Sequence, residues 1–278
     1  MNTRAGHLSI ALLFALLMPA AAAPQMPATE LAPHRAIYEL TLQSSRGTRP
    51  IESVRGRILY DFNGNSCEGY ALQFRQVSEI DTGEGKVLMS DLRAATWEDG
   101  AARAFRFTSE NYLNENLVDA VDGSAERRDS DIGIGLKKPE KKTFSLEQGV
   151  IFPTEHMRRI IEAARAGEKL LDVAVYDGSE TGEKVYNTLT VIGQSIAPSD
   201  TDDAAKGNQE LAKLRRWPVT ISYFDRAKRE GEQEPAYSIG FELYENGISR
   251  KLTLDYNDFV ISGRMSQLEL KPASACAK

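Results

Sequence analysis

Hydrophobic and polar residues alternate along most of this chain, a pattern typical of half-buried β-strands. Between residues 34 and 42, for example, Tyr38, Leu40 and Leu42 fall on one face, because successive side chains of a strand point to opposite faces of the sheet. The same alternation predicts strands over residues 34–42, 54–62, 67–77, 86–94, 102–112, 117–122, 142–147, 169–177, 184–193, 218–225, 236–245, 249–256 and 259–270. We therefore predict a mainly β protein with an antiparallel sheet.

Turn residues separate these predicted strands. Asn63-Gly64-Asn65-Ser66 is expected to join residues 54–62 to residues 67–77 as a hairpin, and Glu245-Asn246-Gly247 has the strongest hairpin signal in the chain. Asp122-Gly123 is also interpreted as a turn. Many short strands with frequent turns favour a sheet that curls or closes to protect its edges. A parallel α/β fold would need a helix between most strands, and this pattern lacks those helices.

One segment has helical periodicity. Within residues 155–166, apolar side chains recur at positions 157, 160, 161 and 164, with Thr154 as the expected N-cap and Gly167 just past the end. The apolar stripe of this helix should pack on the sheet. The helix, taken as residues 154–166, lies near the middle of the body and would join two β halves. A second, weaker helix is predicted over residues 209–215.

The N-terminus has the pattern of a secretory signal peptide. Arg4 precedes an apolar run over residues 8–18, followed by Pro19 and the small residues 20–23. The run holds eleven residues, whereas a membrane-spanning helix needs about 20. We predict that residues 1–23 are cleaved, that residues 24–278 form one domain or two closely packed halves, and that this body has no transmembrane segment.

The composition is acidic. The formal net charge is −6 at pH 7, and the isoelectric point is about 5.3. Nucleic-acid binding needs a basic face that displaces counterions from phosphates. We therefore predict no nucleic-acid partner.

The chain contains two cysteines, Cys67 and Cys276. An even number of cysteines in an exported protein favours a disulfide, and two free thiols are the alternative. Because the bridge would close most of the chain into one loop, the chain-entropy model gives a stabilisation of about 5 kcal/mol as an upper value. A redox enzyme is disfavoured, since catalytic thiols usually occur as Cys-x-x-Cys.

No catalytic, metal or cofactor motif is complete. His34 and His156 remain after removal of the signal, and neither belongs to an H-E-x-x-H arrangement. Gly133 and Gly135 lack the third glycine of a dinucleotide-binding loop, and Ser124 lacks the glycines of a nucleophile elbow. We predict no enzyme activity, no metal and no cofactor. Trp97, Trp217 and the tyrosines are expected in the core, although the concave face of a curved sheet could present them to a lipid or peptide.

Several stretches resemble a known family. Residues 31–40 (LAPHRAIYEL), 56–70 (GRILYDFNGNSCEGY), 152–156 (FPTEH), 244–252 (YENGISRKL) and 255–263 (DYNDFVISG) are similar to the cell-envelope-integrity protein B (EipB) family of alphaproteobacteria. The resemblance runs from residue 31 to the end, and the two cysteines fall where that family places its disulfide. It implies a Gram-negative periplasmic protein folded as a long, open, barrel-like antiparallel β-spiral similar to lipoprotein carriers. It also implies a role in envelope integrity under stress and a periplasmic partner with tetratricopeptide repeats.

Three functional hypotheses remain open at this stage. The first, which we favour, is a non-catalytic protein that binds a lipid, lipoprotein or protein partner in the concavity of the sheet. The second is a hydrolase acting on the envelope, and the third is a scaffold of a periplasmic complex. The sequence assigns no ligand-binding residue, and Cys67 and Cys276 are its only assigned site residues.

Overall fold

A computed structural model describes residues 29–47, 51–83, 85–198, 208–227, 234–273 and 276. The predicted signal peptide, residues 1–23, lies outside the described residues. Within the described ranges, no helix is long and apolar enough to cross a membrane.

The described chain forms one antiparallel sheet of 14 strands with one α-helix. Eight strands precede the helix in the sequence: β1 (His34–Ser45), β2 (Ser53–Asn65), β3 (Gly69–Asp81), β4 (Val87–Glu98), β5 (Ala104–Leu113), β6 (Asn116–Arg127), β7 (Asp131–Lys138) and β8 (Lys142–Glu147). After helix α1 (Pro153–Ala166) come β9 (Leu170–Val175), β10 (Tyr186–Ile192), β11 (Arg216–Asp225), β12 (Tyr237–Tyr244), β13 (Ser249–Asp255) and β14 (Phe259–Leu270). The predicted mainly β fold is confirmed.

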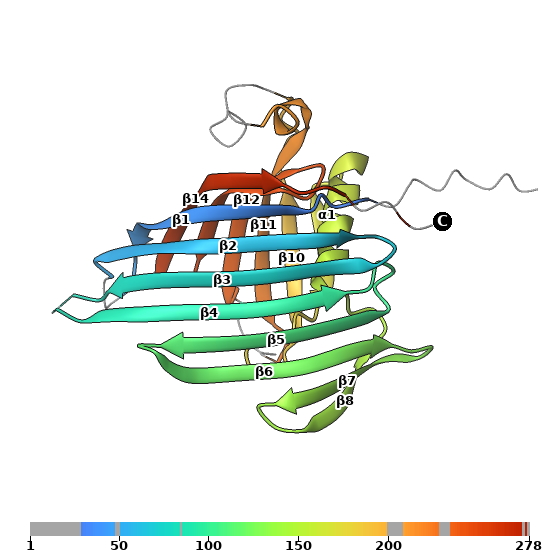
Figure 1. Cartoon of the computed structure of the whole chain (residues 1–278), viewed down its shortest axis with the longest axis horizontal. Helices are drawn as coiled ribbons and strands as arrows, with labels where there is room; N and C mark the ends of the chain where they lie inside the picture. Colours follow the sequence, from blue (N-terminus) through green and yellow to red (C-terminus); the bar gives the residue numbers. More distant parts are fainter. Residues whose placement is uncertain are drawn as a thin grey trace, which may run out of the picture.

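The first and last strands meet in the middle of the sheet. The spatial order runs β8-β7-β6-β5-β4-β3-β2-β1-β14-β13-β12-β11-β10-β9, so β1 pairs with β14 and the strands that flank α1 in sequence form the two edges. The sheet curls: β2 to β6 form a broad front layer, and β10, β11 and β12 run behind it at a steep angle (Figure 1). The result is an open, barrel-like sheet. Whether it counts as one domain or two halves stays a prediction.

Backbone pairing partly covers the edge strand β9. The N–H of Ile151, between β8 and α1, donates to the carbonyl of Ala174 at 2.9 Å, and the N–H of Tyr176 donates to the carbonyl of Ile151 at 2.9 Å. Unpaired strand edges invite association with other chains. The segment before α1 therefore protects this edge and brings the helix next to β9 and β10.

Helix α1 buries the predicted apolar stripe. Ile160 and Ile161 are fully buried, and Gly167 ends the helix in the left-handed region with φ of 82°, where a residue without Cβ is favoured. The predicted N-cap was wrong: Phe152 occupies that position without a side-chain bond, and Pro153 begins the helix. The predicted helix over residues 209–215 is reduced to a 3-10 turn, Leu211–Lys213.

The predicted hairpin between β2 and β3 is confirmed but its turn was misplaced, and the turn predicted at Asp122-Gly123 was wrong. The β2–β3 turn lies at residues 66–68, because Gly64 is still paired with Tyr70 and the side chain of Asn65 accepts the N–H groups of Cys67 and Glu68, each at 2.8 Å. Gly123 lies inside β6, where a Cβ would come within 2.5 Å of the ring of Phe107. The ring of Phe107, directly opposite on the neighbouring strand β5, occupies the space that a side chain would need, which explains this glycine better than a turn.

Strand β7 was missed by the sequence analysis. Its glycines, Gly133 and Gly135, pair with Glu126 and Ser124 of β6. They weaken the apolar alternation that indicates a strand. Tertiary pairing on both sides, with β6 and with β8, overrides that local preference.

Candidate binding site

The concave face of the sheet encloses an elongated apolar cavity. Its larger part has a volume of about 400 Å³, and a smaller hollow of about 190 Å³ adjoins it beside the start of α1. Six residues line both parts: His34, Tyr60, Met157, Ile221, Tyr223 and Gly247. Cavities of this size, mostly apolar with a few polar groups, are typical of small-molecule sites.

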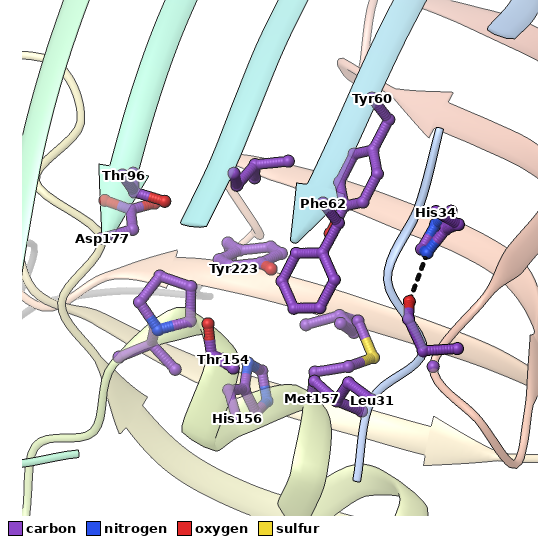
Figure 2. Close-up of a pocket in the computed structure, with 16 residues that line it drawn as sticks. Leu31, His34, Tyr60, Phe62, Thr96, Thr154, His156, Met157, Asp177 and Tyr223 are labelled. Atoms are coloured by element: carbon purple, nitrogen blue, oxygen red, sulfur yellow. Dashed lines mark hydrogen bonds between the residues drawn. The ribbon is translucent and has the colours of Figure 1, made fainter. Parts of the chain in front are cut away.

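Two walls and a base form this cavity. Strands β2, β3 and β4 supply one wall, and β11, β12 and β13 supply the opposite wall. Met157 of α1 closes the base (Figure 2). Alternation places these side chains inward: in β2, Ile58 faces the cavity and is 3% exposed, whereas its neighbour Leu59 points outward and is 36% exposed.

Tyrosines form the most distinctive part of the lining. The rings of Tyr223 and Tyr237, on adjacent strands, stack with centroids 4.5 Å apart, and Tyr186 meets both edge-on at 5.9 and 5.8 Å. Across the cavity, Tyr60 stacks on His34 at 5.4 Å. Burial raises the pKa of Tyr60 to about 12 and also raises the pKa of Tyr223 and Tyr237. All of these phenols are neutral at physiological pH.

A carboxylic acid lies at one end of the smaller hollow. Asp177 follows β9 and lines this hollow together with Thr96 of β4 and Tyr223 of β11 (Figure 2). Its Oδ1 accepts the N–H of Ser179 at 2.9 Å, and burial raises the pKa of the Asp177 carboxyl. No lysine or arginine lines either part of the cavity within the described chain.

The loop that holds Asp177 is packed firmly. The hydroxyl of Tyr176 donates to the carbonyl of Gly182 at 2.6 Å, and the ring of Tyr176 meets Phe107 of β5 edge-on at 5.6 Å. Gly178 has φ of 69°, and a Cβ there would lie 2.4 Å from Phe107. Contact with the opposite half of the sheet therefore sets the position of the carboxyl.

His34 and His156, the two histidines considered in the sequence analysis, both line the smaller hollow. His34 Nδ1 lies 2.7 Å from the carbonyl of Ala32, and His156 Nε2 lies 3.4 Å and 3.5 Å from the hydroxyls of Thr190 and Thr188. Burial lowers the pKa of both, that of His156 to about 4 with a smaller contribution from Arg159. Each imidazole is therefore neutral at pH 7.

Both histidines are weak bases in this arrangement. With a pKa near 4, His156 is a poor proton acceptor at neutral pH. The polar contacts of both histidines are to neutral oxygens. In the part of the chain that the structure describes, no group of three metal-ligating side chains converges. The hollow offers apolar surface, aromatic rings and one acid.

The two cysteines lie away from the cavity. Cys67 in the β2–β3 turn and Cys276 form a disulfide with Cα atoms 5.7 Å apart. Nearby, Lys271 after β14 pairs with Asp61 of β2, and its Nζ lies 2.8 Å from Asn63 Oδ1. The bridge and this ion pair both attach the segment after β14 to β2 and its turn.

The sequence analysis assigned no ligand-binding residue, although it considered the histidines and tyrosines that line the cavity. Of the aromatic residues it singled out, Trp217 is buried in the core and Trp97 lies under the guanidinium of Arg106, with 5.0 Å between the guanidinium carbon and the ring centroid. Alternation does place Tyr60 and Tyr223 on the inner faces of their strands. Only the curl of the sheet shows that those faces meet.

Comparisons with known proteins agree with this architecture. The EipB-like family model matches residues 25–272. The cell envelope integrity protein EipB of Brucella abortus (strain 2308) is 38% identical over 263 residues, covering 93% of this chain and 92% of that protein. A crystal structure of a β-barrel-like protein with a domain of unknown function, also from Brucella abortus, matches with a TM-score of 0.81 and 38% identity. This match covers 88% of this chain and 100% of the other. The chain therefore belongs to the EipB-like family.

Proposed function

We propose that this member of the EipB-like family is a non-catalytic periplasmic protein that supports envelope integrity by holding the apolar part of a lipid or lipoprotein in its cavity. The cavity is the observation that supports the proposal: about 400 Å³ bounded mainly by aliphatic and aromatic side chains on two facing walls. Removing an acyl chain from water into such a space is favourable in proportion to the apolar area buried.

The cellular role and place rest on other observations. The Brucella relative is named a cell envelope integrity protein, and the first residues of this chain have the pattern of a signal peptide. A carrier in an aqueous compartment must shield the acyl chain from water, and the inner face of a curled sheet can do so. The family resemblance also implies a shape similar to that of lipoprotein carriers, which supports the same function.

Binding of N-phenyl-1-naphthylamine, an uncharged apolar fluorophore, tests the proposal. The purified protein should give saturable fluorescence enhancement with one site per chain. Ile58→Trp fills the cavity and should weaken binding about tenfold, the equivalent of about 1.4 kcal/mol. Leu59→Trp adds the same bulk on the outer face of the same strand and should leave affinity unchanged.

Absence of saturable binding would overturn the proposal, and so would equal effects of the two tryptophan variants. The alternatives formed from the sequence, an envelope hydrolase or a scaffold, stay predictions, as does a tetratricopeptide-repeat partner. A stoichiometric protein partner retained by Ile58→Trp would favour the scaffold, because the cavity would then not be needed.

A further inference from the structure

Among the described residues, the lining of the cavity combines one aspartate carboxyl with aromatic faces and includes no lysine or arginine. We propose that it selects amphiphiles whose polar end is a cationic ammonium group, held between the carboxyl of Asp177 and the rings of Tyr223 and Tyr237. This inference rests on the proposed function and names the ligand class of the same site.

The charge of the lining supports a cationic ligand. Asp177 is the one aspartate or glutamate among the described residues that line either part, and the two histidines there are neutral at pH 7. Asp177 is half-buried, and a negative charge there without an opposite charge is costly, whereas pairing with a cation offsets that cost. An ammonium group would supply the missing partner, whereas a fatty-acid carboxylate would meet a like charge.

Aromatic rings add a second source of selectivity. A cation placed over the face of a tyrosine is attracted by the ring quadrupole, most strongly where water is excluded. Tyr223 lines both parts of the cavity, and Tyr237 stacks on it at 4.5 Å. Burial raises the pKa of both phenols, and the negative charge of Asp177 raises it further. The carboxyl is therefore close enough to both rings to interact with them electrostatically.

The surroundings of Asp177 leave room for this role. Its Oδ1 accepts the Ser179 N–H, and Asp177 lines the hollow together with Thr96 of β4 and Thr154 of α1 (Figure 2). Met157 and Phe62 line the same hollow, which continues into the larger apolar part. A head group near Asp177 would therefore extend its chain into the larger part.

Three probes of equal chain length test the inference: dodecyltrimethylammonium, dodecanol and dodecanoate, each below its micelle concentration and each displacing the bound fluorophore. The wild-type protein should bind the ammonium probe about tenfold more tightly than dodecanol, and dodecanoate most weakly. Asp177→Asn retains an oxygen that can accept the Ser179 N–H but removes the charge. It should abolish the preference, so that the ammonium probe and dodecanol bind with equal affinity.

The aromatic contribution has its own matched pair. Tyr223→Phe keeps the ring face and should retain the preference, whereas Tyr223→Leu removes the ring and should lower the ratio of ammonium-probe affinity to dodecanol affinity. Equal binding of the ammonium probe and dodecanol by the wild type would overturn the inference while leaving apolar binding intact. Equal losses for both probes in Asp177→Asn would also overturn it, because the acid would then be purely structural. Failure of all three probes to bind would instead overturn the proposed function.

Discussion

Glu98, the last residue of β4, accepts the backbone N–H of Thr154 in the first turn of α1 at 2.7 Å. Its second oxygen accepts the N–H of Glu155 at 2.8 Å. The two partners of the first bond lie 56 residues apart in sequence. A buried side chain from the sheet thus satisfies the N–H groups that a local N-cap residue usually binds, and it attaches α1 to the wall opposite β9 and β10.

Replacing Glu98 should destabilise the fold. Glu98→Ala leaves two N–H groups without an acceptor in a site where the side chain is 1% exposed, so we expect a loss of about 1–3 kcal/mol in the free energy of unfolding. Glu126→Ala, an exposed site on β6, is the control and should change stability little. Urea unfolding measures both variants. Equal stability of the two would mean that α1 does not depend on Glu98.

His156 should make stability depend on pH. Burial lowers its pKa to about 4 in the folded protein, whereas the unfolded value is about 6.5. Between these values the unfolded chain holds a proton that the folded chain lacks, so this contribution to stability grows as pH rises from about 4 to 6.5. For a side chain that is 3% exposed, the contribution amounts to about 3 kcal/mol.

Glu98 has the opposite effect on the pH dependence of stability, over almost the same pH range. Burial raises its pKa to about 7, so its ionisation lowers stability as pH rises from about 4.5 to 7. Comparing wild type with His156→Gln at each pH isolates the histidine. The difference in unfolding free energy between the two proteins should change across pH 4 to 6.5, and a constant difference would show that His156 titrates alike in both states.

The disulfide should contribute strongly to thermal stability. It joins residues 209 positions apart, for which the chain-entropy model gives about 5 kcal/mol as an upper value. Cys67→Ser should lower the melting temperature by several degrees or more in calorimetry. Reductant should lower the melting temperature of the wild type but not of the variant, and the double variant Cys67→Ser/Cys276→Ser should match the single one. An identical wild-type melting curve with and without reductant would contradict this prediction.

Gly178 should tolerate no side chain. It has φ of 69°, and a Cβ would lie 2.4 Å from Phe107, so Gly178→Ala combines backbone strain with a clash and should cost about 1–3 kcal/mol. Gly149→Ala is the matched control, because no atom lies within 4 Å of the added Cβ. Thermal unfolding compares them. If both variants have the same melting temperature, the loop that holds Asp177 can move away from Phe107 freely.

Local patterns were sufficient for much of the fold. Alternation located most strands, and helical spacing located α1. The even number of cysteines in a chain with a predicted signal peptide favoured the bridge between Cys67 and Cys276, which the structure contains. These features depend only on residues close in sequence or on the number of residues of one type. The errors arose where a distant contact decides: Glu98 satisfies the start of α1, and Phe107 explains the glycine at position 123.

By itself, the sequence determined the strand faces, the central helix and an acidic, cysteine-poor composition, because side-chain periodicity and residue counts need no knowledge of contacts. The tertiary structure alone decided that β1 meets β14 and that β2 faces β11. It also brought Asp177 and Tyr223 to the same hollow, 46 positions apart in a chain whose sequence marks neither as a partner of the other. The physical reason is the curl of the sheet, which turns separate inner faces into one enclosed surface.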